Sequence, residues 1–289
     1  MAEIKKGDIV ARKSYDKDIF FKVIDVFIDK NKKKHALVKG IDMRLYASAP
    51  VEDLEPIEAM DVANYWKKMM KKANDQINRV FSRRMEEREK SFSRALKREY
   101  REQKKKIESF DKPGTVLHLD GDEDYLNLCL TTYRQMGVPA HGYHVAEERQ
   151  PRVVAQYLEE HRPDILVLTG HDGFVKGKKD YKDVRNYHNS QNFIDAVRAA
   201  RHYEKNMDDL IIFAGACQSY YEAILESGAN FASSPKRVLI HAFDPVFVVE
   251  KIAFTSIYDP VPLKDVIDGT ITGFDGIGGF ERLKVHSEF

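Results

Sequence analysis

A cysteine and a histidine stand in similar positions behind two apolar segments of the chain. Cys217 follows "LIIFA" and two small residues, and His171 follows "DILVLTG". An imidazole beside a thiol can take its proton, and the thiolate attacks carbonyl carbon atoms. Backbone N–H groups of Gly173 and Cys217 would then form an oxyanion hole. The pattern predicts nucleophilic catalysis if the two segments are neighbouring strands.

Each of these residues has a plainer interpretation when it is taken alone. A lone cysteine behind an apolar strand is usually packed in the core, and a lone histidine there usually has structural polar partners. The combination of both residues, 46 positions apart, favours catalysis. Cys129 has apolar neighbours at helical spacing and is interpreted as a core residue. His141, His144 and His241 are interpreted as structural.

Acidic residues follow a third apolar segment, "TVLHLD". Asp120, Asp122 and Asp124 match the first ligands of an EF-hand loop, but Tyr125 replaces its glycine and Thr131 replaces its final glutamate, which argues against calcium. Two interpretations stay open. The cluster caps the following helix, or it forms an anionic pocket for an arginine or lysine side chain of a substrate.

The segments that hold these residues alternate between strand and helix patterns. The strand-like segments are "TVLHLD", "VPAHGYHV", "DILVLTG", "LIIFAGA" and "RVLIHAFDP", and helix-like segments lie between them. This alternation predicts a mostly parallel sheet with helices on both faces. Functional groups of such sheets gather beyond the carboxyl ends of the strands. His171, Cys217 and the acidic cluster are therefore expected at one edge.

Two other parts precede this α/β part. Residues 1–57 contain short β-branched and aromatic segments separated by turns, which predict a small SH3-like β-barrel that docks partners or shields the site. Residues 58–112 lack Gly and Pro and are rich in basic residues, which predicts a long basic helical arm. A solvated arm is the plain interpretation, and a nucleic-acid or acidic-protein surface is the alternative. The α/β domain is then 113–289.

Composition narrows the class of protein. The chain has 289 residues, 43% of them hydrophobic, and a net charge of +1, so its bulk charge predicts no nucleic-acid partner. Its two cysteines provide no disulfide framework and no CxxC metal site. The N-terminal segment lacks the apolar part of a secretory signal. We expect an intracellular protein without membrane contact, whose chemistry needs no metal or cofactor.

The motifs "ILVLTGHDG" and "LIIFAGACQS" resemble those of the caspase-like cysteine peptidases. In that group one hydrophobic strand ends in His-Gly, and a later strand ends in a small residue followed by Cys. This sequence departs from the pattern because Asp172 separates His171 from Gly173. The resemblance implies a caspase-like sheet.

Longer blocks resemble the YabG family of sporulation-specific proteases of spore-forming bacteria. They include "VLHLDGDEDYL", "CLTTYRQMGVPAHG", "PDILVLTGHDG", "FAGACQS", "GANFASSPKRVLIHAFDPV" and "GGFERL". The resemblance implies a cysteine endopeptidase with Cys217 and His171 as its catalytic residues. It also implies cleavage after arginine in spore coat and cortex-associated proteins. The expected location is the mother-cell cytoplasm and later the spore coat.

Cleavage after arginine requires a carboxylate in the pocket for the residue before the cut bond, the S1 pocket. Asp120 and Asp122 are the first candidates and Asp172 is the next, and the sequence does not choose among them. Ser233 or Ser234, in "ASSPKR", is a candidate for contact with the substrate backbone.

The arginine preference also suggests self-cleavage in the basic arm, at Arg83, Arg84 or nearby residues. One rival is an amidotransferase-like acyl transferase, but there the catalytic histidine usually follows the cysteine. The other rival is a non-enzymatic spore coat assembly adaptor, which binds through the barrel and the basic helix. This adaptor needs neither Cys217 nor His171.

Overall fold

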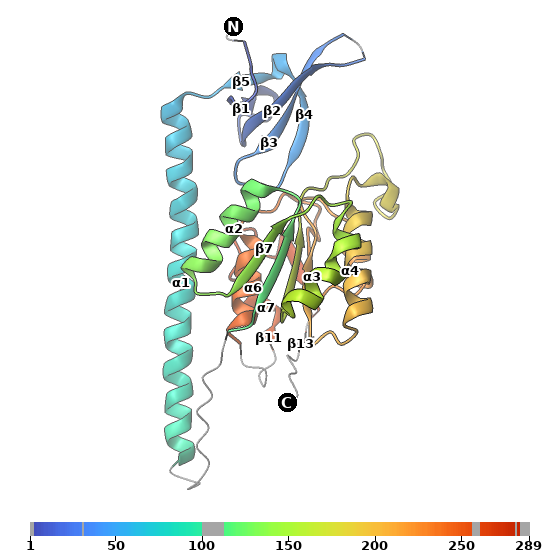
Figure 1. The fold of residues 1–289 in the computed structure, drawn as a ribbon. Helices are drawn as coiled ribbons and strands as arrows, with labels where there is room; N and C mark the ends of the chain where they lie inside the picture. Colours follow the sequence, from blue (N-terminus) through green and yellow to red (C-terminus); the bar gives the residue numbers. More distant parts are fainter. Residues whose placement is uncertain (1–2, 31, 100–112, 256–260, 281, 284–289) are drawn as a thin grey trace.

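The computed structural model consists of a small antiparallel sheet, a long helix and a larger α/β part (Figure 1). The small sheet stands at one end of the α/β part, and the long helix runs beside it. The structure describes residues 3–30, 32–99, 113–255, 261–280 and 282–283, without the side chains of 91–99 and 282–283.

The N-terminal sheet has five antiparallel strands in the order β4-β3-β2-β1-β5. Its buried core includes Val10, Val23 and Val38, and a register shift after Val23 marks a bulge in the long second strand. The SH3-like closure of this sheet stays a prediction. The strands are β1 (Ile9–Arg12), β2 (Phe20–Ile28), β3 (Lys34–Gly40), β4 (Tyr46–Pro50) and β5 (Leu54–Pro56).

A single long helix, α1 (Ala59–Glu99), follows this sheet. Its buried residues recur every three or four positions, at Met69, Ala73, Ile77 and Val80, as expected for a helix with one apolar face. The last three belong to the same hydrophobic cluster as the α/β sheet. The helix predicted for the basic arm is therefore present over the described part, and one face of it is packed. The remainder of the predicted arm, from 100 to 112, lies outside the described residues.

The second sheet confirms the predicted α/β class. Its order is β12-β10-β9-β8-β6-β7, in which β12 alone is antiparallel to its neighbour. Burial on both faces explains the continuous apolar runs of its central strands. The strands are β6 (Val116–Asp120), β7 (Ala140–His144), β8 (Ile165–Thr169), β9 (Ile211–Ala214), β10 (Phe231–Ser233) and β12 (Ile277–Gly279).

Helices cover both faces of this sheet. Alternate residues of each central strand join opposite clusters, so Val167 of β8 packs on one side and Leu166 on the other. The first face carries α1, α2 (Glu123–Gln135), α6 (Asp244–Ala253) and α7 (Leu263–Ile267). The other carries α3 (Gln150–His161), α4 (Ser190–Tyr203) and α5 (Tyr221–Glu226). A short pair, β11 (Val261–Pro262) with β13 (Arg282–Leu283), completes the assigned sheets. No helix in the described ranges is long and apolar enough to cross a membrane.

The strand predicted from "RVLIHAFDP" is wrong. The place next to β9 belongs to β10, which pairs Phe231 with Phe213. The predicted segment makes only an isolated bridge, between His241 and Met43, before α6 begins. Its residues are apolar because they are buried, as Ile240 is. An apolar run shows burial but does not by itself distinguish a strand from another buried segment.

A buried carboxylate joins α1 to α6. Glu250 is completely buried and accepts hydrogen bonds from Arg83 at 2.5 Å and from Arg84 at 2.7 Å. Arg84 also donates to the carbonyl of Met136 at 2.8 Å. The two arginines considered as self-cleavage sites are thus bound within a helix–helix contact.

We expect Glu250→Ala to lower the free energy of unfolding by about 3 kcal/mol, because it leaves two partly buried arginines without their partner. Urea denaturation followed by circular dichroism measures this loss. Glu87→Ala is the matched control, since Glu87 pairs with Lys251 but its side chain is 46% exposed. Its expected loss is below about 1 kcal/mol, and equal losses in the two variants would contradict the role given to Glu250.

Candidate active site

The ends of three adjacent strands bring the predicted chemistry together. Strand β8 pairs in parallel with β6 on one side and with β9 on the other. The register places Asp120 opposite Thr169, and His171 follows two residues later. Cys217 follows the end of β9. The carboxyl edge of the sheet therefore carries the acidic cluster, the histidine and the cysteine in this spatial order.

A tight turn holds Cys217 against the segment before α6. Gly215 has a φ of 110°, which favours glycine, and the Cys217 Sγ atom accepts a hydrogen bond from the Ile240 N–H at 3.2 Å. Burial raises the pKa of the Cys217 thiol to about 12, although the backbone N–H groups of Ile240 and Arg44 act in the opposite direction. The thiol is completely buried and therefore protonated at neutral pH in this arrangement.

His171 is held by carboxylates on both sides of its ring. Glu147 Oε1 lies 3.3 Å from Nδ1 and accepts the His171 backbone N–H at 2.6 Å. Asp122 Oδ2 lies 3.3 Å from Nε2. The rings of Tyr46 and Tyr125 lie against the imidazole, with centroid distances of 4.1 and 5.7 Å. The histidine is therefore enclosed by residues of both sheets and of α2.

The two carboxylates favour the imidazolium form of His171. Burial acts against the charged ring, but Asp122 and Glu147 outweigh it and raise the pKa of His171 above its ordinary value. The contact between Asp122 and His171 also lowers the pKa of Asp122, which is about 2 although burial acts to raise it. No hydrogen bond within the described part of the chain joins His171 to Cys217. The carboxylates thus favour the protonated ring, and in this arrangement the ring is bonded to neither the thiol nor its proton.

The acidic cluster contains an occupied arginine site. Asp120 Oδ2 accepts a hydrogen bond from the Arg44 guanidinium at 2.7 Å, and both side chains are completely buried. Thr169 donates to the same carboxylate at 2.9 Å. Burial disfavours the Asp120 anion, but Arg44 reverses this effect and holds the pKa of Asp120 far below its usual range. Of the three predicted aspartates, Asp120 forms the ion pair with this arginine.

Asp122 has a different set of partners. Its Oδ1 atom accepts the Tyr125 N–H at 3.0 Å, which caps the start of α2. Lys39 of β3 donates to both of its oxygens, at 2.9 and 2.8 Å. The helix-cap interpretation is therefore confirmed for Asp122. Both Asp120 and Asp122 bind a cation of the N-terminal sheet or its loop, and the pocket for a substrate side chain stays a prediction.

Asp172 anchors the loop that follows the histidine. It accepts the N–H groups of Gly173 and Asn189, each at 2.8 Å, and the Ser190 hydroxyl. The Gly173 N–H is thus engaged, and an oxyanion could use it only after this bond opens. The oxyanion role of Gly173 and Cys217 stays a prediction.

The two predicted serines lie near the cysteine turn. Ser234 Oγ accepts the Gln218 N–H at 3.1 Å and donates to the Val238 carbonyl at 2.7 Å, so it supports the turn after Cys217. Ser233 is buried in β10, and its hydroxyl has no hydrogen-bond partner among the described residues. Contact of either serine with a substrate backbone stays a prediction.

Sequence reasoning missed several residues of this site. Glu147 comes shortly after β7, so the strand-end rule that identified His171 would also have identified it. Gly121 and Gly170 leave room for its carboxylate, which a Cβ atom at either position would meet. Arg44 carries no local signal, because its partner is 76 residues away in another sheet.

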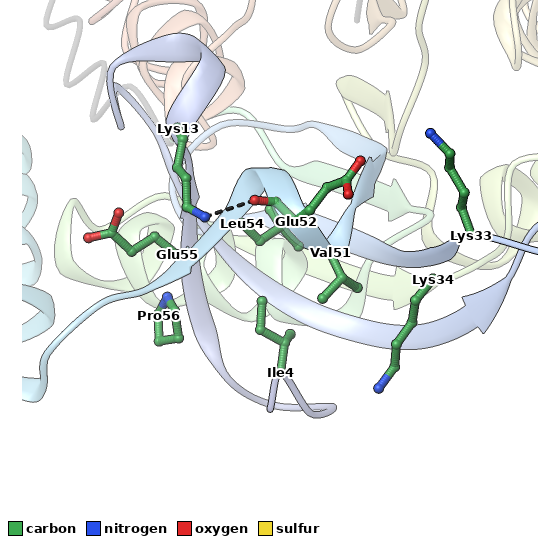
Figure 2. A pocket seen from close by; sticks show the side chains of 9 residues that line it. All are labelled: Ile4, Lys13, Lys33, Lys34, Val51, Glu52, Leu54, Glu55 and Pro56. Atoms are coloured by element: carbon green, nitrogen blue, oxygen red, sulfur yellow. Dashed lines mark hydrogen bonds between the residues drawn. The ribbon is translucent and has the colours of Figure 1, made fainter. Parts of the chain in front are cut away.

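A cavity of about 610 Å³ lies on the N-terminal sheet (Figure 2). Its charged residues have both signs, and Lys13 Nζ donates to the Glu52 carbonyl at 2.8 Å. Its lining does not include the residues at the carboxyl edge of the α/β sheet. It is lined by Ile4, Lys13, Lys33, Lys34, Val51, Glu52, Leu54, Glu55 and Pro56.

Comparison with known proteins identifies a protease. Residues 5–286 match the sequence profile of the family described as YabG peptidase U57. The chain is also 38% identical over 281 residues to the sporulation-specific protease YabG of Bacillus subtilis (strain 168). The aligned region covers 96% of this chain and 95% of that protein. The chain therefore belongs to the YabG family of sporulation proteases, and the resemblance of its longer sequence blocks to that family is confirmed.

We expect Asp122→Asn to lower the pKa of His171, because it removes a carboxylate that stabilises the imidazolium while asparagine can still cap α2. NMR titration of the histidine ring protons measures the change. Asp124→Asn is the control, since Asp124 contacts Lys39 and its side chain is 62% exposed. A pKa of His171 that is unchanged in Asp122→Asn would contradict the electrostatic role of Asp122.

Proposed function

We propose that this protease is a cysteine endopeptidase that cleaves after arginine, with Cys217 as nucleophile and His171 as its acid–base partner. The observation that carries the proposal is the Asp120 site. It holds an arginine side chain in a fully buried ion pair at the same sheet edge as the thiol and the imidazole. A parallel sheet with histidine and cysteine after neighbouring strands also supports the caspase-like architecture.

The Asp120 site suits arginine for chemical reasons. One guanidinium nitrogen of Arg44 bonds to the carboxylate, and another lies 3.3 Å from the Ala242 carbonyl and 3.4 Å from the Cys129 sulfur. A planar fork with several N–H donors can reach all three acceptors, whereas the single ammonium group of lysine cannot. A substrate arginine in this site would place its carbonyl near the residues around Cys217.

The proposed reaction uses the two groups in sequence. His171 is released from its carboxylate contacts as neutral imidazole, moves toward the sulfur and takes the thiol proton, and the Cys217 sulfur attacks the carbonyl carbon of the arginine residue. The peptide C–N bond then breaks, and the imidazolium protonates the departing amine. Water hydrolyses the thioester and restores the thiol. Glu147 and Asp122 favour the charged form of the ring, which His171 adopts between the two proton transfers.

The family supplies the biological context. The similar protein of Bacillus subtilis is named a sporulation-specific protease. We accordingly place the substrates among spore coat and cortex-associated proteins, and the enzyme in the mother cell and then on the spore coat. The N-terminal sheet shields the site, because Tyr46 lies against His171 and Arg44 fills the Asp120 site.

Hydrolysis of fluorogenic peptides tests this function. The chain should release the reporter from peptides that end in arginine and not from matched peptides that end in alanine. Cys217→Ala and His171→Ala should each reduce this turnover to background, because each removes one reacting group. His141→Ala is the control, since His141 lies at the start of β7 and stacks on His161. It should retain the activity of the unmodified chain.

Two results would contradict the proposal. Full activity in Cys217→Ala would exclude the thiol as nucleophile. Absence of turnover on arginine, lysine and protein substrates, even with the Arg44→Gln variant described below, would favour a role in coat assembly without catalysis.

A further inference from the structure

The loop between β3 and β4 is buried, although loops of hairpins normally lie on the surface. It comprises residues 41–45, since β3 ends at Gly40 and β4 begins at Tyr46. Asp42 is 8% exposed and Arg44 is fully buried. This loop therefore enters the α/β part instead of facing solvent.

The backbone of the loop pairs with the segment beside Cys217 in the manner of an added strand. Met43 forms an antiparallel bridge with His241. The Arg44 N–H donates to the Ile240 carbonyl at 3.3 Å, and the Ala242 N–H donates to the Asp42 carbonyl at 2.8 Å. Extended peptides bind many proteins through such main-chain bonds, with the side chains entering pockets.

The side chain of Arg44 enters the pocket that such a peptide would use for recognition. Its guanidinium binds Asp120 at 2.7 Å. Its backbone lies at the cysteine, because Ile240 accepts the Arg44 N–H and donates its own N–H to Cys217 Sγ. One residue thus fills the proposed S1 pocket and places its main chain beside the proposed nucleophile.

The chain beyond Arg44 leads to the histidine. Tyr46, two residues further, lies with its ring 4.1 Å from the ring of His171. The Arg44–Leu45 peptide bond therefore connects a residue next to Cys217 with a segment that contacts His171. A bound substrate needs this order along the chain, with the cut bond between nucleophile and proton donor.

We propose that the β3–β4 loop is bound as a substrate of its own active site, and that the Arg44–Leu45 bond is a self-cleavage site of the protein. This inference rests on the proposed arginine-directed activity and names its first substrate. While the bond is intact, Arg44 excludes other arginine side chains from the Asp120 pocket. The uncut chain is therefore the latent form of the enzyme.

The cleavage step uses the same two groups as the proposed reaction, after His171 has moved toward the sulfur. Neutral His171 takes the proton of the Cys217 thiol, and the sulfur forms a bond to the Arg44 carbonyl carbon while the bond from this carbon to the Leu45 nitrogen breaks. His171 gives its proton to that nitrogen, which becomes the amino group of a new chain. Water then adds hydroxide to the Arg44 carbonyl and returns a proton to sulfur. The products are residues 1–44 and 45–289.

The two products would stay associated under native conditions. Strand β4 still pairs with β3, and β5 still pairs with β1, across the cut. Native gel filtration would consequently miss the event. Intact mass spectrometry under denaturing conditions, with sequencing of the new N-terminus, detects it.

The experiment incubates the full chain and follows the masses over time. The unmodified chain should yield fragments that end at Arg44 and begin at Leu45, at a rate independent of protein concentration. Cys217→Ala should stay whole. Arg44→Gln should not be cut at this bond but should hydrolyse arginine peptides without the initial lag of the uncut chain. Arg12→Gln is the control, since it removes an ion pair of the same sheet with Asp53 and should leave cleavage unchanged.

The outcomes separate this inference from the proposed function. If Arg44→Gln hydrolyses arginine peptides while the unmodified chain is never cut between Arg44 and Leu45, the self-cleavage site is wrong and the peptidase stands. If a fragment beginning at Leu45 also forms in purified Cys217→Ala, the cut is not made by this site. If no variant cleaves itself or an arginine peptide, the proposed function fails with it.

Discussion

The ion pair between Arg44 and Asp120 is the contact on which the arrangement of this protein depends. Both side chains are fully removed from water. An unpaired ion in such a buried position would destabilise the fold by roughly 3–5 kcal/mol. Asp120 is fixed further by Thr169 and by the Asp122 N–H, at 2.9 Å each. The carboxyl edge of the large sheet thus offers a rigid anionic pocket, and the N-terminal sheet is positioned by the arginine that fills it.

This contact also holds one loop against the segment beside the cysteine and against the histidine. The loop that carries Arg44 lies beside Cys217, whose buried thiol is protonated, and continues to Tyr46 on the ring of His171. The two carboxylates that flank His171 raise its pKa and so favour the charged ring, against the effect of burial. The same loop therefore lies against both groups that we propose to react.

Local pattern predicted the part of the site that depends on strand ends. Apolar runs followed by small residues placed His171 and Cys217 on neighbouring strands, and the acidic cluster on the next one. The same reasoning failed for the segment around Ile240, because burial made it apolar without making it a strand. The role of Arg44 could not be predicted, because it comes from a contact with Asp120, 76 positions away. The residues next to Arg44 in the sequence give no sign of this contact. The same contact distinguishes Asp120 from Asp122 and Asp172, among which the sequence did not choose.

The affinity of an arginine peptide for inactive protein tests most directly whether Arg44 occupies the substrate pocket. In the Cys217→Ala background, Arg44→Gln should bind a fluorescent peptide ending in arginine about tenfold more tightly or better, which corresponds to at least about 1.4 kcal/mol, because the competing side chain is gone. Arg12→Gln in the same background should not change the affinity. Equal affinity with and without Arg44 would contradict the account.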